Sequence, residues 1–407
     1  MKPFLILILL GTLNLPTLGA DWPQFLGPNR DGSAPASEMP VKGDSESVTL
    51  WKRDLGSGFA GPVVVGTDVI VFHRQGNEMI TESLNAADGQ TKWKHSYNTD
   101  YRDSFGFDNG PRAVPAVVDG VIFTHGPEGR VEALQLTDGS PVWSFDTVKE
   151  VGSPQGFFGR ACSPLVIHGK VILNVGGPNA GIIALDAKQG TLLWKSTSHE
   201  AGYASGVVMP GDSSTAAFFT RNGITVLNAA NGQVLADERF RADMEASVNA
   251  ASPLACGEGH LFFSACYDVG AGIWQWDKTK QSLTHIWNKS EALDCHYSTP
   301  VWHNGHLYGF HGRQESGAVL RCVSGIDGTV KWESSLSVPG GTLIRLHDHL
   351  LIVTERGELW VVKANPSKFD LLTTTQIMGL RHRSHAAFAN GILYARDSEK
   401  LVAVKIN

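Results

Sequence analysis

One pattern recurs along this chain roughly every 42 to 53 residues, from the region of residue 60 to the C-terminus. Each copy opens on a proline or small residue, passes through apolar stretches separated by turns, and closes on a tryptophan. Three successive copies end in SLNAADGQTKW, ALQLTDGSPVW and ALDAKQGTLLW, closing on Trp93, Trp143 and Trp194. A period of this length indicates a repeat architecture, in which neighbouring units bury a shared core.

The apolar stretches within each copy are short and alternate with turn residues, which predicts strands rather than helices. The last turn of a copy carries pairs such as Asp138-Gly139 and Asn231-Gly232, which supply the positive φ angles of tight hairpins. Four strands fit in each copy, so we predict an all-β fold, a β-propeller of four-stranded antiparallel blades. The periodic tryptophans share one phase, so we expect them to pack between blades.

Eight copies can be counted from the residues that open their first strands: Pro62, Pro115, Pro164, Gly206, Pro253, Pro300, Leu343 and Ala386. The eighth copy ends after three strands at Asn407, whereas Val48 to Leu55 forms a strand with Trp51 and no blade before it. We therefore predict an eight-bladed propeller closed by an N-terminal strand that completes the last blade, which removes an open sheet edge. Seven blades would follow if the irregular fourth or seventh copy were incomplete.

The first 20 residues contain Lys2, an apolar run and small residues at Gly19 and Ala20, which predicts a signal peptide over 1–20. Residues 21–47 then form an N-terminal extended segment, and 48–407 form the propeller. No cysteine directly follows the apolar run, so we do not expect a lipid anchor, and no later stretch is long and apolar enough for a transmembrane segment. We expect a periplasmic or secreted monomer.

The formal net charge of -6, without a basic run, argues against a nucleic-acid partner. The five cysteines match no zinc-binding spacing. Cys266 and Cys295 are the disulfide candidate, because both are expected on the same face of the ring. The alternative is that all five cysteines are small buried hydrophobic residues.

Two stretches between blades are unusually long, Lys94 to Arg112 and Ser144 to Arg160, and long loops in a compact domain are often functional. Loops between blades lie on one face of a propeller, around the mouth of its channel. The candidate ligand-binding residues there are Asp108, Arg112, Arg160, Tyr203, Asn249, His296, Tyr297, Arg383 and His385. Arginine, aromatic and amide groups can hold a planar anionic ligand. The alternative is that they bond carbonyls of neighbouring blades and seal the channel.

Candidate catalytic and metal-binding residues are harder to find. The pairs His303 and His306, and His347 and His349, flank turns on the face opposite the long loops. His382 and His385 are three residues apart, a spacing that places strand side chains on opposite faces. We therefore expect no metal site and assign no catalytic residue.

The motif ALDAKQGTLLW and its relatives resemble the repeat of the PQQ-like (pyrroloquinoline quinone) β-propellers, over nearly the whole chain after residue 20. That group includes quinoprotein alcohol dehydrogenases and the outer-membrane β-barrel assembly lipoprotein. The segment DWPQFLGPNRDG, Asp21 to Gly32, is similar to the start of exported, mostly uncharacterised bacterial members. Quinoprotein dehydrogenases of this type stack their quinone on an adjacent Cys-Cys pair, and this chain has no such pair.

The resemblance and the residues together favour an exported, non-catalytic binding or scaffold propeller, which presents its loop-rich face to a protein, peptide or glycan partner. We expect no cofactor for this function. The alternative is a PQQ-dependent or other oxidoreductase, with PQQ and calcium at the channel mouth near Asp108, Arg112, Arg160 and Arg383.

Overall fold

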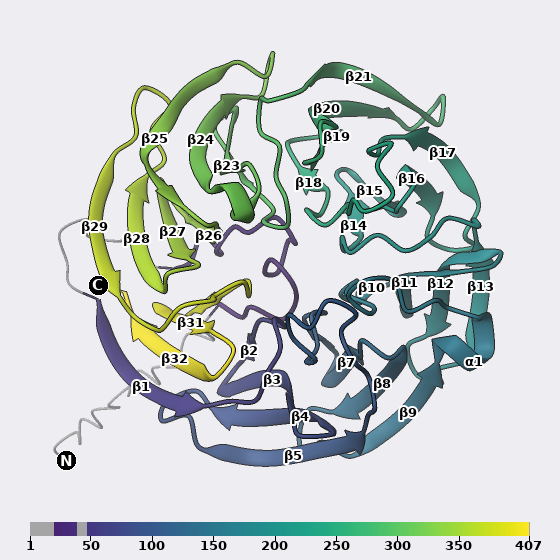
Figure 1. The fold of residues 1–407 in the computed structure, drawn as a ribbon. Helices are drawn as coiled ribbons and strands as arrows, with labels where there is room; N and C mark the ends of the chain where they lie inside the picture. The colour runs from purple at the N-terminus through teal and green to yellow at the C-terminus, as the bar shows by residue number, and fades with distance from the viewer. Residues whose placement is uncertain (1–19, 39–46, 407) are drawn as a thin grey trace, which may run out of the picture.

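The computed structural model describes residues 20–38 and 47–406. In these ranges the chain forms eight four-stranded sheets that stand as blades around a common axis (Figure 1). Neighbouring strands within each blade are antiparallel, as in the pairs β2 with β3 and β20 with β21. The predicted eight-bladed β-propeller is confirmed, and the irregular fourth and seventh copies are complete blades.

The first four blades follow the chain in order. Blade 1 contains β2 (Val63–Val65), β3 (Asp68–Gln75), β4 (Glu78–Asn85) and β5 (Thr91–Asn98). Blade 2 contains β6 (Ala116–Val118), β7 (Val121–His125), β8 (Arg130–Gln135) and β9 (Pro141–Asp146). Blade 3 contains β10 (Leu165–Ile167), β11 (Lys170–Gly177), β12 (Ala180–Asp186) and β13 (Leu192–Ser196). Blade 4 contains β14 (Val207–Met209), β15 (Asp212–Phe219), β16 (Gly223–Asn228) and β17 (Val234–Arg239).

The remaining blades return the chain to its start. Blade 5 contains β18 (Leu254–Ala255), β19 (His260–Ala265), β20 (Gly270–Asp277) and β21 (Ser282–Lys289). Blade 6 contains β22 (Val301–His303), β23 (His306–His311), β24 (Ala318–Ser324) and β25 (Val330–Val338). Blade 7 contains β26 (Gly341–Leu346), β27 (His349–Thr354), β28 (Glu358–Lys363) and β29 (Leu371–Gln376). Blade 8 contains β30 (Ala387–Ala389), β31 (Ile392–Arg396), β32 (Lys400–Lys405) and β1 (Val48–Asp54).

The ring closes as the sequence predicts. Strand β1 pairs antiparallel with β32, with Trp51 opposite Ala403, and becomes the outer strand of blade 8. Trp51 then donates a hydrogen bond from Nε1 to the carbonyl of Ala86 in blade 1, at 2.9 Å. One strand therefore joins the two ends of the repeat array and covers an edge that would otherwise be open.

Residues 20–38 lie in the centre of the ring, where they are purple in Figure 1. Trp22 forms a bridge with Val64 of blade 1, and Ser33 forms one with Arg345 of blade 7. Arg30 is buried between these contacts, and the carboxylate of Glu38 accepts hydrogen bonds from the backbone of blade 8. Residues 20–38 thus connect several blades and occupy the channel, which the prediction of an extended segment did not include.

Short helices interrupt two of the loops. Helix α1 (Thr147–Val151) lies within the predicted loop from Ser144 to Arg160, which also contains the end of β9. Asp146 caps α1 by accepting hydrogen bonds from two backbone N–H groups, and Gly152 ends it with a φ of 67°. The 3-10 helix η1 (Gln314–Ser316) lies between β23 and β24.

None of the described helices is both long and apolar enough to cross a membrane. The predicted signal peptide falls, apart from Ala20, outside the described residues.

The disulfide predicted between Cys266 and Cys295 is not formed, because both are free buried thiols. The Cys266 thiol donates to the carbonyl of Asp294 at 3.0 Å, whereas the Cys295 thiol donates to that of Leu293 at 3.5 Å. The prediction rested on a shared face of the ring, but each sulfur is directed to a backbone carbonyl. All five cysteines are small buried residues, which was the alternative prediction.

Candidate functional site

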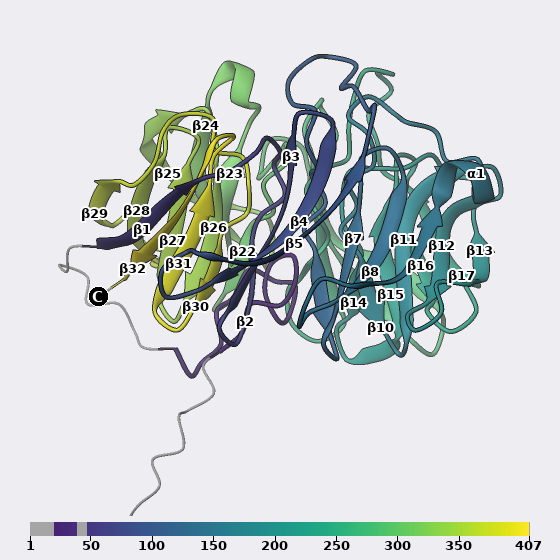
Figure 2. The same cartoon turned by 90° about the horizontal axis from the view of Figure 1, so that it is seen from below.

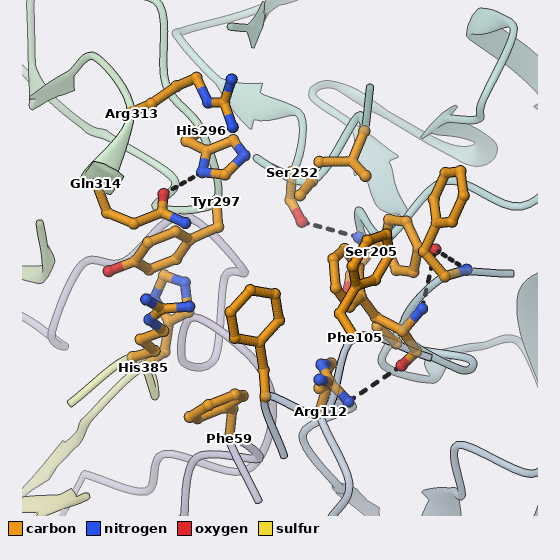
Figure 3. Close-up of a pocket in the computed structure, with 18 of the residues that line it drawn as sticks. Phe59, Phe105, Arg112, Ser205, Ser252, His296, Tyr297, Arg313, Gln314 and His385 are labelled. Atoms are coloured by element: carbon orange, nitrogen blue, oxygen red, sulfur yellow. Dashed lines mark hydrogen bonds between the residues drawn. The ribbon is translucent and has the colours of Figure 1, made fainter. Parts of the chain in front are cut away.

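A cavity of about 370 Å³ lies on the loop-rich face, at the mouth of the channel. Figure 2 shows long loops standing above one end of the ring, and Figure 3 shows the cavity that they surround. Its lining comes from loops between blades, from second-to-third strand loops of blades 5 and 6, and from Phe25 of the N-terminal segment. This volume falls within the range of small-molecule and peptide-anchor sites.

One wall of the cavity is aromatic. Phe105 and Phe107, from the long loop between β5 and β6, are 56% and 60% exposed. The Phe105 ring lies 5.3 Å from that of Phe158, and the Phe158 ring lies 5.5 Å from that of Tyr203, both measured between centroids. Phe157 joins the same cluster, with its centroid 5.8 Å from that of Phe105. Loops from three successive blades therefore build one continuous aromatic surface.

Arg112 crosses the base of this aromatic wall. Its guanidinium lies 5.5 Å from the ring centroids of both Phe59 and Phe158. It also donates to the carboxylate of Asp103 at 2.9 Å and to the carbonyl of Phe158 at 3.1 Å, the second of which Figure 3 shows. Arg112 thus holds the two long loops together while one part of its side chain faces the cavity.

The opposite wall contains a polar network on the loops that lead into blades 6 and 8. Tyr297 donates to Glu355 at 2.6 Å, and Arg383 donates to the other oxygen of the same carboxylate at 3.3 Å. Burial, followed by the neighbouring Glu355 charge, raises the pKa of Tyr297 well above its usual value. Tyr297 therefore stays a neutral donor, and Glu355 fixes its direction.

His296 is held on both ring nitrogens. Its Nε2 lies 2.7 Å from the Tyr267 hydroxyl, and its Nδ1 bonds to Gln314 of η1. Burial lowers the pKa of His296, so the ring is neutral at pH 7. Arg313 extends from the same loop, with its guanidinium 4.7 Å from the centroid of the Tyr267 ring, and forms an ion pair with Glu315.

The channel side of the cavity is closed by the N-terminal segment. Phe25 packs edge-on against His385, with ring centroids 4.9 Å apart, and both line the cavity. Burial lowers the pKa of His385 to about 3. Arg30 lies against the Phe25 ring and donates to the carbonyls of Pro164 and Gly206, both at 3.0 Å.

Hydroxyl groups connect successive blades next to the cavity. In each case a backbone N–H donates to a side-chain hydroxyl of the next blade, at 2.8 to 3.0 Å. The N–H of Val114 donates to the hydroxyl of Ser163, and the N–H of Ser163 donates to the hydroxyl of Ser205. The N–H of Ser205 donates to the hydroxyl of Ser252, and the N–H of Ser252 donates to the hydroxyl of Thr299. We call these four hydroxyl residues the hydroxyl ladder. Ser163, Ser205 and Ser252 line the cavity, whereas Thr299 does not.

Six of the nine candidates predicted from the sequence line the cavity: Arg112, Tyr203, His296, Tyr297, Arg383 and His385. The other three are used within the fold. Arg160 is buried and donates to the carbonyls of Pro127 and Ser153.

Asn249 and Asp108 also bond to backbone groups. The amide of Asn249 donates to the carbonyl of Thr220 at 2.9 Å, and the carboxylate of Asp108 accepts from the N–H of Gly58 at 3.2 Å. For these three positions the structure favours the alternative that the side chains stabilise the propeller itself.

Sequence reasoning missed several lining residues. Phe25 belongs to the N-terminal segment, whose path could not be inferred from the repeat. Arg313 and Tyr267 lie in second-to-third strand loops, whereas the candidates were sought in the loops between blades. The hydroxyl ladder could have been predicted from the sequence, because a serine or threonine directly precedes the residue that opens each of blades 3 to 6.

The cavity is poor in groups for acid-base or metal chemistry. Among the described residues that line it, Glu315 is the single carboxylate. No group of three His, Cys, Asp or Glu side chains in ranges 20–38 and 47–406 is placed to hold a metal ion. The lining residues therefore do not fit the calcium-bound quinone that a quinoprotein dehydrogenase would hold.

Comparison with known proteins places this fold and repeat in a family. Residues 82–334 match the family described as outer membrane protein assembly factor BamB. The chain is 24% identical to BamB of Burkholderia pseudomallei over 289 residues, which is 63% of this chain and 69% of the relative. It is 30% identical over 151 residues to the quinohemoprotein alcohol dehydrogenase ADH-IIG of Pseudomonas putida, a match of 36% of this chain and 20% of that enzyme.

Solved structures show the same architecture. The crystal structure of BamB from Moraxella catarrhalis superposes with a TM-score of 0.66 at 15% identity, covering 89% of this chain and 98% of that one. At this identity the likeness shows the fold alone, whereas the family match spans more than half of the sequence. The chain therefore belongs to the PQQ-like β-propeller family described as outer membrane protein assembly factor BamB.

Proposed function

We propose that this protein is an exported, monomeric and non-catalytic binding propeller, which holds an extended peptide segment of another protein on its loop-rich face. The observation that carries the proposal is the exposure of Phe105 and Phe107 above a cavity of about 370 Å³. Large exposed apolar side chains that border a cavity are typical of interaction sites, because their burial by a partner is favourable. Export is supported by the leader-like pattern of residues 1–20.

A peptide fits this wall better than a glycan does. Its four clustered phenylalanines, Phe105, Phe107, Phe157 and Phe158, have no polar edge that could bond sugar hydroxyls. Apolar peptide side chains gain from such a surface, and aromatic partners gain further from edge-to-face or offset packing. The membership of the BamB family is in keeping with a protein partner.

The histidines of the cavity are poorly suited to acid-base catalysis. A general base works best with a pKa near the working pH. Burial lowers the pKa of His385 to about 3 and also lowers that of His296, whose ring nitrogens are both occupied. The proposed function uses these rings as neutral hydrogen-bonding groups and requires no cofactor.

A random peptide library displayed on phage with free carboxyl ends, selected against the full chain, tests the proposal. Selected peptides should carry large apolar residues, and the double variant Phe105→Ser, Phe107→Ser should weaken their binding at least tenfold, measured by fluorescence anisotropy. The control is Ile326→Ser, which removes an apolar side chain that is 82% exposed in a third-to-fourth strand turn, on the face opposite the cavity. This control should bind like the wild type.

Two results would overturn the proposal. Binding on a glycan array without enrichment of any peptide would replace the peptide partner by a carbohydrate. Stoichiometric uptake of PQQ with calcium, together with dye reduction by alcohols or sugars, would show an oxidoreductase instead.

A further inference from the structure

Several hydroxyl groups that line the cavity have a proton that no described residue accepts. The hydroxyl oxygens of Ser163, Ser205 and Ser252 each accept a backbone N–H. A serine hydroxyl has one proton, and no described residue accepts the proton of any of these three. Three hydroxyl groups that line the cavity are therefore free to donate to a ligand.

Tyr203 has the same property. Its hydroxyl oxygen accepts the N–H groups of Phe157 and Phe158, at 2.8 and 3.3 Å, so its proton remains available. Burial raises the pKa of Tyr203, which keeps that proton in place at pH 7. Tyr203 therefore adds a fourth available hydroxyl donor to the residues that line the cavity.

The charges near the cavity also favour an anion. Three lining arginines are matched by carboxylates: Arg112 by Asp103, Arg313 by Glu315, and Arg383 by Glu355. Arg30 lies behind Phe25 and does not itself line the cavity, but it has no carboxylate partner among the described residues, and its Nη2 has no hydrogen-bond acceptor there. Its two carbonyl partners belong to Pro164 and Gly206, which directly follow Ser163 and Ser205 in the chain.

We infer that the cavity binds a carboxylate carried on an aromatic or branched apolar group, supplied by the carboxyl end of a peptide or by a free acid. The carboxylate accepts hydrogen bonds from Ser163, Ser205 and Ser252, near the unpaired charge of Arg30. The apolar group lies against Phe105 and Phe158. This inference rests on the proposed function, because it names the part of a peptide that enters the cavity.

The physical reason is that a buried donor without an acceptor is costly, whereas a hydrogen bond from a neutral donor to an ion is strong. An amide or ester has a carbonyl but no charge, so it gains less than a carboxylate does from the hydroxyls and from the positive charge of Arg30. A ligand that only fills the aromatic wall would leave these donors unused. The structure thus separates a site for the apolar group from a site for the anion.

The first experiment varies the ligand and leaves the protein unchanged. Isothermal titration calorimetry of the full chain compares acetyl-Ala-Ala-Phe carrying a free carboxylate with the same peptide as its C-terminal amide. We expect the acid to bind at least tenfold more tightly than the amide. Equal affinity, tighter binding of the amide, or no binding of either would overturn the inference.

A second arm identifies the source of the carboxylate. If 3-phenylpropionate binds as tightly as the peptide acid, the carboxylate comes from a free acid; if only the peptide acid binds, it comes from a peptide terminus. Library peptides that bind with their carboxyl ends blocked would leave the proposed function standing and remove the inference. If phage selection and both titrations give no binding, both the proposed peptide-binding function and the carboxylate site are wrong.

Variants of the hydroxyl ladder distinguish a ligand site from a structural seal. Ser205→Ala and Thr299→Val each remove one hydroxyl that accepts a backbone N–H, but only Ser205 lines the cavity. Ser205→Ala should weaken the peptide acid at least fivefold and bring its affinity closer to that of the amide. Thr299→Val should leave the ratio of acid to amide affinity unchanged. An equal change of this ratio in both variants, or in neither, would contradict the inference.

Discussion

The Trp93 ring covers Gly139 at the last turn of the next blade, where an added Cβ would lie 2.3 Å from the indole Cε3. The same relationship joins Trp51 to Gly89 and Trp143 to Gly190. The repeat motif, a glycine turn followed by a closing tryptophan, therefore reflects two requirements. One is the geometry of the turn, and the other is the contact between the glycine of one blade and the tryptophan of the preceding blade. Each glycine supplies a positive φ and leaves room for the preceding tryptophan.

Replacing Gly139 by alanine should cost more stability than replacing Gly120. Both have positive φ angles, 72° and 76°, but a Cβ at Gly120 meets no atom within 4 Å. Backbone strain costs roughly 1 kcal/mol at each position, and the clash with Trp93 adds about 1–3 kcal/mol at Gly139. Urea denaturation of the two variants measures this difference. Equal losses would mean that the tryptophan moves away without cost.

Replacing Trp143 by phenylalanine should be more destabilising than the same change at Trp194. The Trp143 Nε1 donates to the carbonyl of Ala187 at 2.9 Å, whereas the buried Nε1 of Trp194 has no acceptor among the described residues. The two substitutions remove a similar apolar area, so the lost hydrogen bond should make a difference of about 1 kcal/mol. Thermal and urea unfolding of both variants check this, and a larger loss at Trp194 would contradict it.

Arg160→Ala should lower stability without changing ligand binding, in contrast to a residue that awaits a ligand. The guanidinium bonds to the carbonyls of Pro127 and Ser153 and to the Ser153 hydroxyl. Leaving these buried acceptors without a partner costs roughly 1–3 kcal/mol. The check is urea denaturation together with peptide titration. Reduced affinity at full stability would show that Arg160 reaches the ligand after all.

Arg30→Ala should loosen the attachment of the N-terminal segment to the ring. Its removal leaves the carbonyls of Pro164 and Gly206 without their donor, at a cost of roughly 2–4 kcal/mol. We also expect faster proteolysis between residues 20 and 38, because this segment would lose a contact to blades 3 and 4. Asp21→Ala, which removes a bond to the exposed backbone N–H of Gly66, is the control and should have little effect. Equal cleavage of both variants would contradict this role.

Stability should fall as the pH is lowered from about 6.5 towards 4. Burial lowers the pKa of both His125 and His382 to about 4, so between pH 6.5 and 4 the unfolded chain binds protons at these histidines that the folded protein does not, and stability is lost. At pH 5 the loss is about 2 kcal/mol for each histidine. Asp294 acts in the opposite direction, since burial raises its pKa to about 6.

Denaturation at pH 7 and pH 5 measures this dependence. The variant His125→Asn has no imidazole to protonate, so it should lose less stability than the wild type over this interval, although it starts lower at pH 7. An unchanged pH dependence of stability in the variant would show that His125 does not contribute to it.

The sequence by itself determined the architecture. Strands, turns and the phase of the tryptophans are local patterns, so the number of blades and the closure by Val48–Asp54 could be read without coordinates. The same patterns identified the face that carries the cavity, because connections of each kind lie on one end of a propeller.

Only the tertiary structure decided which side chains reach the cavity. Arg112 and Arg160 both end a long loop, yet Arg112 faces the cavity and Arg160 bonds to buried carbonyls, because the direction of each depends on neighbouring loops. For the same reason Cys266 and Cys295 share a face without forming a disulfide. The insertion of Arg30 into the channel depends on carbonyls more than 130 residues away along the chain, a distance that no local pattern records.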